Sequence, residues 1–203
     1  MKPVSRFARP LALDRTMSRG WRALEEENVG GWIARFSGGV TKRANSVLPS
    51  SAPGDLDACI AKVERRYASR GLPAVFHISP ESLPPDLDAR LCERGYRRLS
   101  PTLVQYLPLE GCGNASTVEP DQRIELADEA SPRWCEAFWG VEGPDTAGEQ
   151  AICREILSAT PSVYASLVHD GRLHAVGRLA LVGDLGGIYS VATEVCQGSE
   201  TVV

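Results

Sequence analysis

The chain has 203 residues, of which 43% are hydrophobic and 24% are charged, a composition typical of a globular protein. No apolar run approaches the roughly 20 residues that a membrane helix requires. Residues 1–10 carry basic side chains but lack the apolar core of a secretory signal. The sequence therefore predicts a soluble, cytoplasmic protein with no membrane partner.

The net charge of −4 is unevenly distributed along the chain. Residues 1–109 contain 17 Lys and Arg against 11 Asp and Glu, whereas residues 110–203 contain 5 against 15. This asymmetry indicates two units that face each other or a cationic ligand for the second, and drift in surface composition explains it equally well. The basic residues of the first half are dispersed and lack an aromatic stacking platform, which argues against a nucleic-acid partner.

The six cysteines are widely scattered, and no CxxC pair occurs among them. A zinc site requires close ligand pairs, and the three histidines show no ligand spacing either. We therefore expect no metal, and we expect free, mostly buried thiols, because a free cysteine packs as a small hydrophobe. These residues are Cys59, Cys92, Cys112, Cys135, Cys153 and Cys196, with His77, His169 and His174.

The first half of the chain alternates between helical and strand-like patterns. The expected elements are a helix from Leu13 to Asn28, a strand over Trp32 to Phe36 between glycine pairs, and a strand over residues 41–49. A helix from Leu56 to Arg70 follows, with Asp55 as its N-cap. A short strand over residues 73–79, a helix after Pro85 with Leu87 and Leu91 on one face, and a strand over residues 96–109 complete this half. We expect Asn45 and Ser46 to make structural hydrogen bonds.

The second half follows a stretch at residues 110–122 that is rich in Gly, Ser, Asn and Pro and is typical of a linker. The expected elements are a strand at residues 123–130, a helix opened by Ser131 and Pro132, a helix from Glu149 to Ala159, and strands at residues 162–170, 172–184 and 188–193. The order is strand, helix, helix, strand, strand, strand.

That order, together with DGRLHAVGRLALVGDLGGIYSVAT at residues 170–193, resembles the GNAT family of acyl-CoA-dependent N-acetyltransferases. GGWIARFSGGVTKRANSVLP at residues 30–49 resembles the later part of such a domain. The resemblance implies the tandem type, in which a degenerate first copy packs against a working second copy. It implies an α/β (α+β) fold with a mixed, mostly antiparallel sheet flanked by helices. The two partial halves are residues 1–109 and residues 123–203, joined by the linker.

The resemblance also implies acetyl-CoA as co-substrate and the amine of a small molecule as acceptor. In this family the pantetheine arm hydrogen-bonds to the backbone of the fourth strand, whose positions match Val191, Ala192 and Thr193. Tyr189 and Ser190 lie on the same strand and are candidates for facing the acyl carbonyl. Glu142 and Asp145 fall in the loop where family members often bind the acceptor, and an acidic loop suits a cationic amine. The alternatives are a buried strand and solvated carboxylates without a catalytic role.

The sequence departs from the family pattern after Thr193. A glycine-rich pyrophosphate loop is expected there, but Glu200 stands where its second glycine belongs and the chain ends at Val203. These features predict a second copy truncated before the loop, with impaired acetyl transfer. The alternative is a non-catalytic remnant or scaffold from a truncated or frame-shifted reading frame. An uncovered sheet predicts self-association, and a permuted single sheet shared by the two halves is left open.

Overall fold

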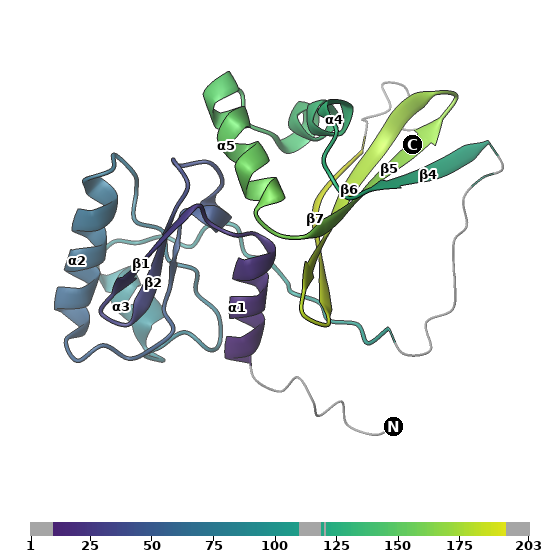
Figure 1. Cartoon of the computed structure of the whole chain (residues 1–203). Coiled ribbons are helices and arrows are strands. Elements are labelled where there is room, and N and C mark those ends of the chain that lie inside the picture. Colours follow the sequence, from purple (N-terminus) through teal and green to yellow (C-terminus); the bar gives the residue numbers. More distant parts are fainter. Residues whose placement is uncertain (1–9, 110–118, 120, 194–203) are drawn as a thin grey trace, which may run out of the picture.

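The computed structural model describes residues 10–109, 119 and 121–193 (Figure 1). These residues form two antiparallel sheets flanked by helices, which confirms the predicted fold class. The strand order is β1-β2-β3 in the first sheet and β4-β5-β6-β7 in the second. The described strands therefore do not build the permuted single sheet that the sequence left open.

A tight hairpin organises the first sheet. Strands β1 (Glu25–Val29) and β2 (Trp32–Phe36) pair antiparallel around Gly30 and Gly31, whose φ angles are +64° and +92°. Two consecutive positive φ angles match the twist of a two-residue hairpin and favour glycine at both positions. Helix α1 (Pro10–Gly20) consequently ends well before Asn28, so the prediction of one helix from Leu13 to Asn28 is wrong.

The strand predicted over residues 41–49 is mostly a turn. A short 3-10 helix, η1 (Lys42–Ala44), precedes a two-residue strand, β3 (Val47–Leu48). The Asn45 side chain accepts hydrogen bonds from the backbone N–H groups of Ser37 and Gly39 and donates to two carbonyls in the turn. This confirms the structural role expected for Asn45, and it explains the turn, because the side chain takes partners that a strand ladder would need.

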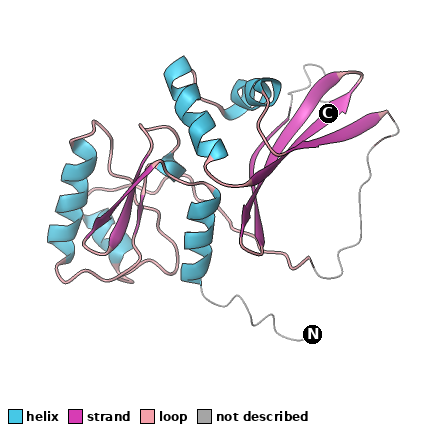
Figure 2. Cartoon of the chain, in the orientation of Figure 1, coloured by secondary structure: helices cyan, strands magenta, loops and turns pink. Residues whose placement is uncertain are grey.

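Two further strand predictions in the first half fail. Over residues 73–79 the only bridge is a parallel one between Phe76 and Val47. Residues 96–109 form a loop, which Figure 2 shows leading away from the first sheet. A strand requires a neighbour that accepts its ladder hydrogen bonds, and no described strand pairs with this segment.

Helices α2 (Leu56–Ala68) and α3 (Leu87–Glu93) occur where the sequence predicts them. The Asp55 side chain accepts from the N–H of Ala58, as expected of an N-cap. Both helices pack on the first sheet and close a core of eleven buried residues. This core consists of Val29, Trp32, Ala34, Phe36, Val47, Cys59, Ile60, Val63, Tyr67, Leu87 and Leu91.

The second half confirms the predicted order of elements. Strand β4 (Gln122–Ala127) is followed by α4 (Pro132–Glu142), α5 (Ala147–Ser158), β5 (Ser162–His169), β6 (Arg172–Val182) and β7 (Leu185–Thr193). The Ser131 hydroxyl caps α4, and Thr146 with Glu149 forms a capping box on α5. Helix α4 packs against β6 and β7.

The other face of the second sheet has no helix over it among the described elements (Figure 1). Large apolar side chains are exposed there, and Ile188 is 75% accessible. The exposed apolar residues of this face are Ile124, Leu126, Leu179, Leu181, Ile188 and Val191. The self-association expected from an uncovered sheet stays a prediction.

Helix α1 joins the two halves of the structure. Backbone carbonyls of its last turn accept hydrogen bonds from side chains of the second half, and the Met17 carbonyl also accepts from the Trp21 N–H at 3.1 Å. Tyr189 Oη donates to the Met17 carbonyl at 3.0 Å, Thr160 Oγ1 to the Arg19 carbonyl at 2.6 Å, and Arg178 Nη1 to the Gly20 carbonyl at 2.8 Å.

The second core extends across this junction. It is built mainly by α4, α5 and the second sheet, but it includes Trp21, Ala23, Val40 and Ala44. The predicted linker lies largely outside the described residues, and the division at residues 109 and 123 stays a prediction. The other members of this second core are Trp134, Cys135, Phe138, Cys153, Ile156, Leu157, Tyr164, Val176 and Ala192.

The described cysteines are free, and all but Cys92 are buried, as expected. Burial raises the pKa of the Cys59, Cys135 and Cys153 thiols, which disfavours the reactive thiolate. Cys112 and Cys196 lie outside the described residues. No described helix has the length and hydropathy required to cross a membrane.

The junction makes a prediction about Gly20. A Cβ at this position would lie 2.5 Å from Tyr189 Oη, so Gly20→Ala should displace the tyrosine and lower the free energy of unfolding by about 1–3 kcal/mol. Gly148→Ala in α5 is the control, because its Cβ meets nothing within 4 Å and should leave stability unchanged or raise it by up to about 1 kcal/mol. Urea unfolding measures both, and equal stability of the two variants would contradict the packing described.

Asp14, in the first half of α1, makes a prediction about pH. Burial raises the pKa of Asp14, but hydrogen bonds from His77 and Ser79 outweigh burial and lower it overall. A lowered folded pKa contributes stability that is present above the unfolded value, near 3.9, and is lost as pH falls through the folded value. Asp14→Asn should therefore be less stable at pH 7 and lose less on acidification from pH 5 to pH 2. Melting curves across this range test it, with the exposed Asp145→Asn as control.

Candidate functional site

Strand β7 forms one edge of the second sheet. Among the described strands it pairs with β6 alone, so its outer row of backbone N–H and C=O groups has no described strand beside it. Such a row can accept an added extended chain through main-chain hydrogen bonds. The resemblance predicts that a strand edge of this kind holds a pantetheine arm.

A β-bulge interrupts β7 at the predicted site. Arg178 pairs with Tyr189 and Val176 with Ala192, so three steps along β7 match two along β6. The extra residue lies at Ser190–Val191, and Ser190 has a φ of +51°. Bulges leave a residue out of the ladder, and together with strained backbone they are over-represented next to active sites.

The bulge determines which face each predicted site residue occupies. Tyr189 and Ala192 both pack toward the helices although they lie three residues apart. Val191 is exposed on the opposite face, close to Gly177 of β6. Thr193 is exposed at the end of the described strand. The structure thus places Val191, Ala192 and Thr193 together on the edge strand.

The two candidates for facing the acyl carbonyl have different surroundings. The Tyr189 hydroxyl donates to the Met17 carbonyl, its ring lies 5.8 Å from that of Trp21, and burial raises its pKa. The Ser190 hydroxyl is buried and has no hydrogen-bond partner among the described residues. Ser190 therefore keeps an uncommitted donor beside the bulge, whereas Tyr189 holds α1.

The two candidates for binding the acceptor, Glu142 and Asp145, are distant from β7 in the sequence and are more exposed than Tyr189 and Ser190. Glu142 ends α4 and Asp145 precedes α5, and both side chains are exposed. No group of three or more possible ligands that could hold a metal ion occurs within the described residues. Within the described residues, no hydrogen bond or ion pair joins these carboxylates to β7.

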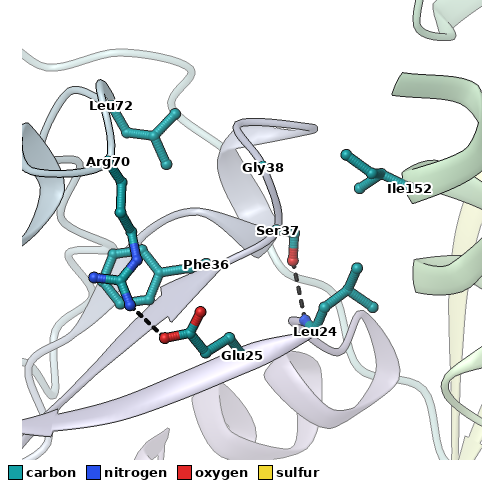
Figure 3. A pocket seen from close by; sticks show the side chains of 8 residues that line it. All are labelled: Leu24, Glu25, Phe36, Ser37, Gly38, Arg70, Leu72 and Ile152. Carbon is teal, nitrogen blue, oxygen red and sulfur yellow. Dashed lines mark hydrogen bonds and ion pairs between the residues drawn. The ribbon is translucent and has the colours of Figure 1, made fainter. Parts of the chain in front are cut away.

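A separate pocket of about 320 Å³ lies where the first sheet approaches α5 (Figure 3). Its polar groups are already paired: Arg70 bonds to Glu25 and stacks 3.8 Å from the Phe36 ring centroid, and Ser37 accepts from the Leu24 N–H. None of the lining residues belongs to β7, so this pocket is separate from the edge at which the resemblance predicts the cofactor. The lining residues are Leu24, Glu25, Phe36, Ser37, Gly38, Arg70, Leu72 and Ile152.

Sequence reasoning missed the bulge and the arginine opposite it. Arg178 is buried in the middle of β6 and pairs with Tyr189 across the ladder. A sequence signal for the bulge does exist, since strict alternation cannot bury both Tyr189 and Ala192. The burial of Arg178 carries no such signal, because its neighbours Trp21 and Gly20 are distant in the chain.

Comparison with known proteins identifies the family. Residues 11–181 match the family model described as "Probable histone acetyltransferase Rv0428c C-terminal". The chain is 25% identical over 181 residues to the uncharacterized N-acetyltransferase YobR of Bacillus subtilis (strain 168), an alignment that covers 88% of this chain and 72% of YobR. No solved structure gives a significant match. The chain therefore belongs to the acetyltransferase family that this model describes.

Proposed function

We propose that this chain transfers an acetyl group from acetyl-CoA to the amine of a small molecule, using the edge of β7 to hold the cofactor. Membership of the acetyltransferase family supports acyl transfer, with an acyl-CoA as donor. The observation that carries the proposal is the edge strand with its bulge at Ser190–Val191, since it provides free backbone groups for a pantetheine arm.

In the proposed reaction the amine nitrogen bonds to the acyl carbon, the C–S bond of the thioester breaks, and the proton that the amine loses passes through solvent water to the CoA thiolate. Positioning of the thioester, stabilisation of charge on the acyl oxygen and attraction of the acceptor each have a residue in this proposal. The backbone from Val191 to Thr193 holds the pantetheine arm and so positions the thioester. The Ser190 hydroxyl donates to the acyl carbonyl oxygen, where negative charge develops as the amine attacks. The exposed carboxylates Glu142 and Asp145 attract a cationic acceptor toward the site. A basic peptide is the second acceptor class to test, because the family description names histone acetylation.

Hydrogen exchange of the wild-type chain tests the cofactor edge. Addition of acetyl-CoA should slow amide exchange in β7, because its edge N–H groups gain partners. The edge strands β1 and β4 are matched controls and should exchange at unchanged rates. Calorimetry on the same samples measures affinity. Absence of binding at millimolar acetyl-CoA, or protection confined to β1 or β4, would contradict the proposal and leave a non-catalytic module.

Substitution of Ser190 tests its proposed role as donor. Ser190→Ala should bind acetyl-CoA within about twofold of wild type, because the backbone holds the arm, and should transfer acetyl groups roughly 100-fold more slowly. Release of CoA thiol with a panel of amines and a basic peptide measures the rate. Ser166→Ala on β5 is the control. A wild-type rate in Ser190→Ala would remove Ser190 from the mechanism.

A further inference from the structure

Arg178 is buried without the partners that its charge requires. Its side chain is 1% exposed, and only Nη1 is hydrogen-bonded, to the Gly20 carbonyl at 2.8 Å. Nε and Nη2 are buried and have no hydrogen-bond partner among the described residues. A buried donor without a partner lowers stability, so such groups are rare and need an explanation.

Arg35 provides a comparison within the same chain. It is equally buried, at 1% exposed, but its Nε donates to the Ser46 carbonyl at 3.0 Å and its Nη2 to Ser46 Oγ at 2.6 Å. The same two donors are therefore satisfied by the chain at Arg35 and left open at Arg178. Burial alone does not account for this difference.

The open donors of Arg178 match one kind of ligand. Nε and Nη2 lie along one edge of the planar guanidinium, and their parallel N–H groups fit the two oxygens of a carboxylate. A second cation is adjacent: the Arg43 guanidinium lies 5.5 Å from the Trp21 ring centroid and 5.6 Å from that of Tyr189. Arg178 lies 5.6 and 5.8 Å from the same two rings.

The charge of this cluster of Trp21, Arg43, Arg178 and Tyr189 is not balanced. Within the described part of the chain, neither Arg43 nor Arg178 forms an ion pair with a carboxylate. An anion would therefore be attracted to the cluster, and Arg43, the exposed member, lies on its solvent side. A planar, singly charged carboxylate suits one buried fork between aromatic rings better than a doubly charged phosphate, which costs more to desolvate.

We propose that Arg178, assisted by Arg43, binds a carboxylate group of the acetyl acceptor. This inference rests on the proposed function. Arg178 pairs with Tyr189, and the bulge at Ser190–Val191, where the proposed function places the thioester, follows directly along β7. The bound carboxylate therefore lies one or two residue positions along β7 from the thioester, at about 3.3 Å per residue. The acceptor is then an amine that carries a carboxylate a few atoms away, as in an amino acid.

Side-chain NMR of the full chain tests this assignment. The Nε–H signal of Arg178 is identified by its loss in Arg178→Lys, or from through-bond spectra if that variant does not fold. Titration with N-acetylglycine should shift this signal saturably. The Arg35 Nε–H, already bonded to Ser46, should not move, and the neutral isostere N-acetylglycinamide should shift neither. Arg43→Gln should weaken the N-acetylglycine response about tenfold, as expected for loss of one charged partner.

Three outcomes would overturn the proposal. If N-acetylglycine does not shift the Arg178 Nε–H signal, water rather than a carboxylate accepts the hydrogen bonds of Nε and Nη2. Equal shifts of Arg35 and Arg178 would indicate an ionic-strength effect. Tighter binding of inorganic phosphate than of N-acetylglycine would assign the fork to a phosphate-bearing ligand. None of these depends on acetyl-CoA binding, so the result is distinguishable from failure of the proposed function.

Discussion

The carboxyl end of α1 is the contact on which the rest of the structure depends. A helix ends with carbonyls that lack intrahelical partners, and burial makes unpaired carbonyls costly. Here the Arg19 and Gly20 carbonyls accept from a side chain just after α5 and from one on β6. The Met17 carbonyl, which also accepts from the Trp21 N–H, is bonded by a side chain on β7. The chain turns directly after Gly20 into Trp21, which packs in the second core. A segment early in the sequence therefore completes a core built mostly by the second half.

The same contact fixes the strand that carries the proposed cofactor edge. Tyr189 is held at its hydroxyl by α1 and at its ring by Trp21, while Ala192 is buried beneath α4. Both side chains point toward the helices although an odd number of steps separates them, so the backbone between them must accommodate an extra residue. The bulge and the positive φ of Ser190 follow from these two anchors.

Much of the fold could be predicted because its elements have local signals. Asp55 and Ser131 mark helix starts that the structure confirms, and the apolar periodicity of the second half predicts its six elements in order. The secondary-structure predictions that failed concern segments whose conformation depends on a pairing partner elsewhere in the chain. Glu25–Val29 continues a helical pattern in sequence but pairs with β2 instead, and residues 96–109 have strand-like composition but no described neighbour. For the site, the sequence indicated β7, which stays a prediction, but neither the bulge nor Arg178.

The sequence by itself indicated an acetyltransferase, because the residues from 170 to 193 and the order of elements before them carry a recognisable pattern, and the family match supports this much. It also marked the start of the strand at Trp32 by the glycine pair before it, although the hairpin that Gly30 and Gly31 make with β1 was not predicted. Only the tertiary structure decided that the two sheets stay separate, that α1 is bound by the second half, and that Arg178 is buried with two open donors. These features arise from contacts between residues more than a hundred positions apart, and periodicity along the chain contains no information about such pairs.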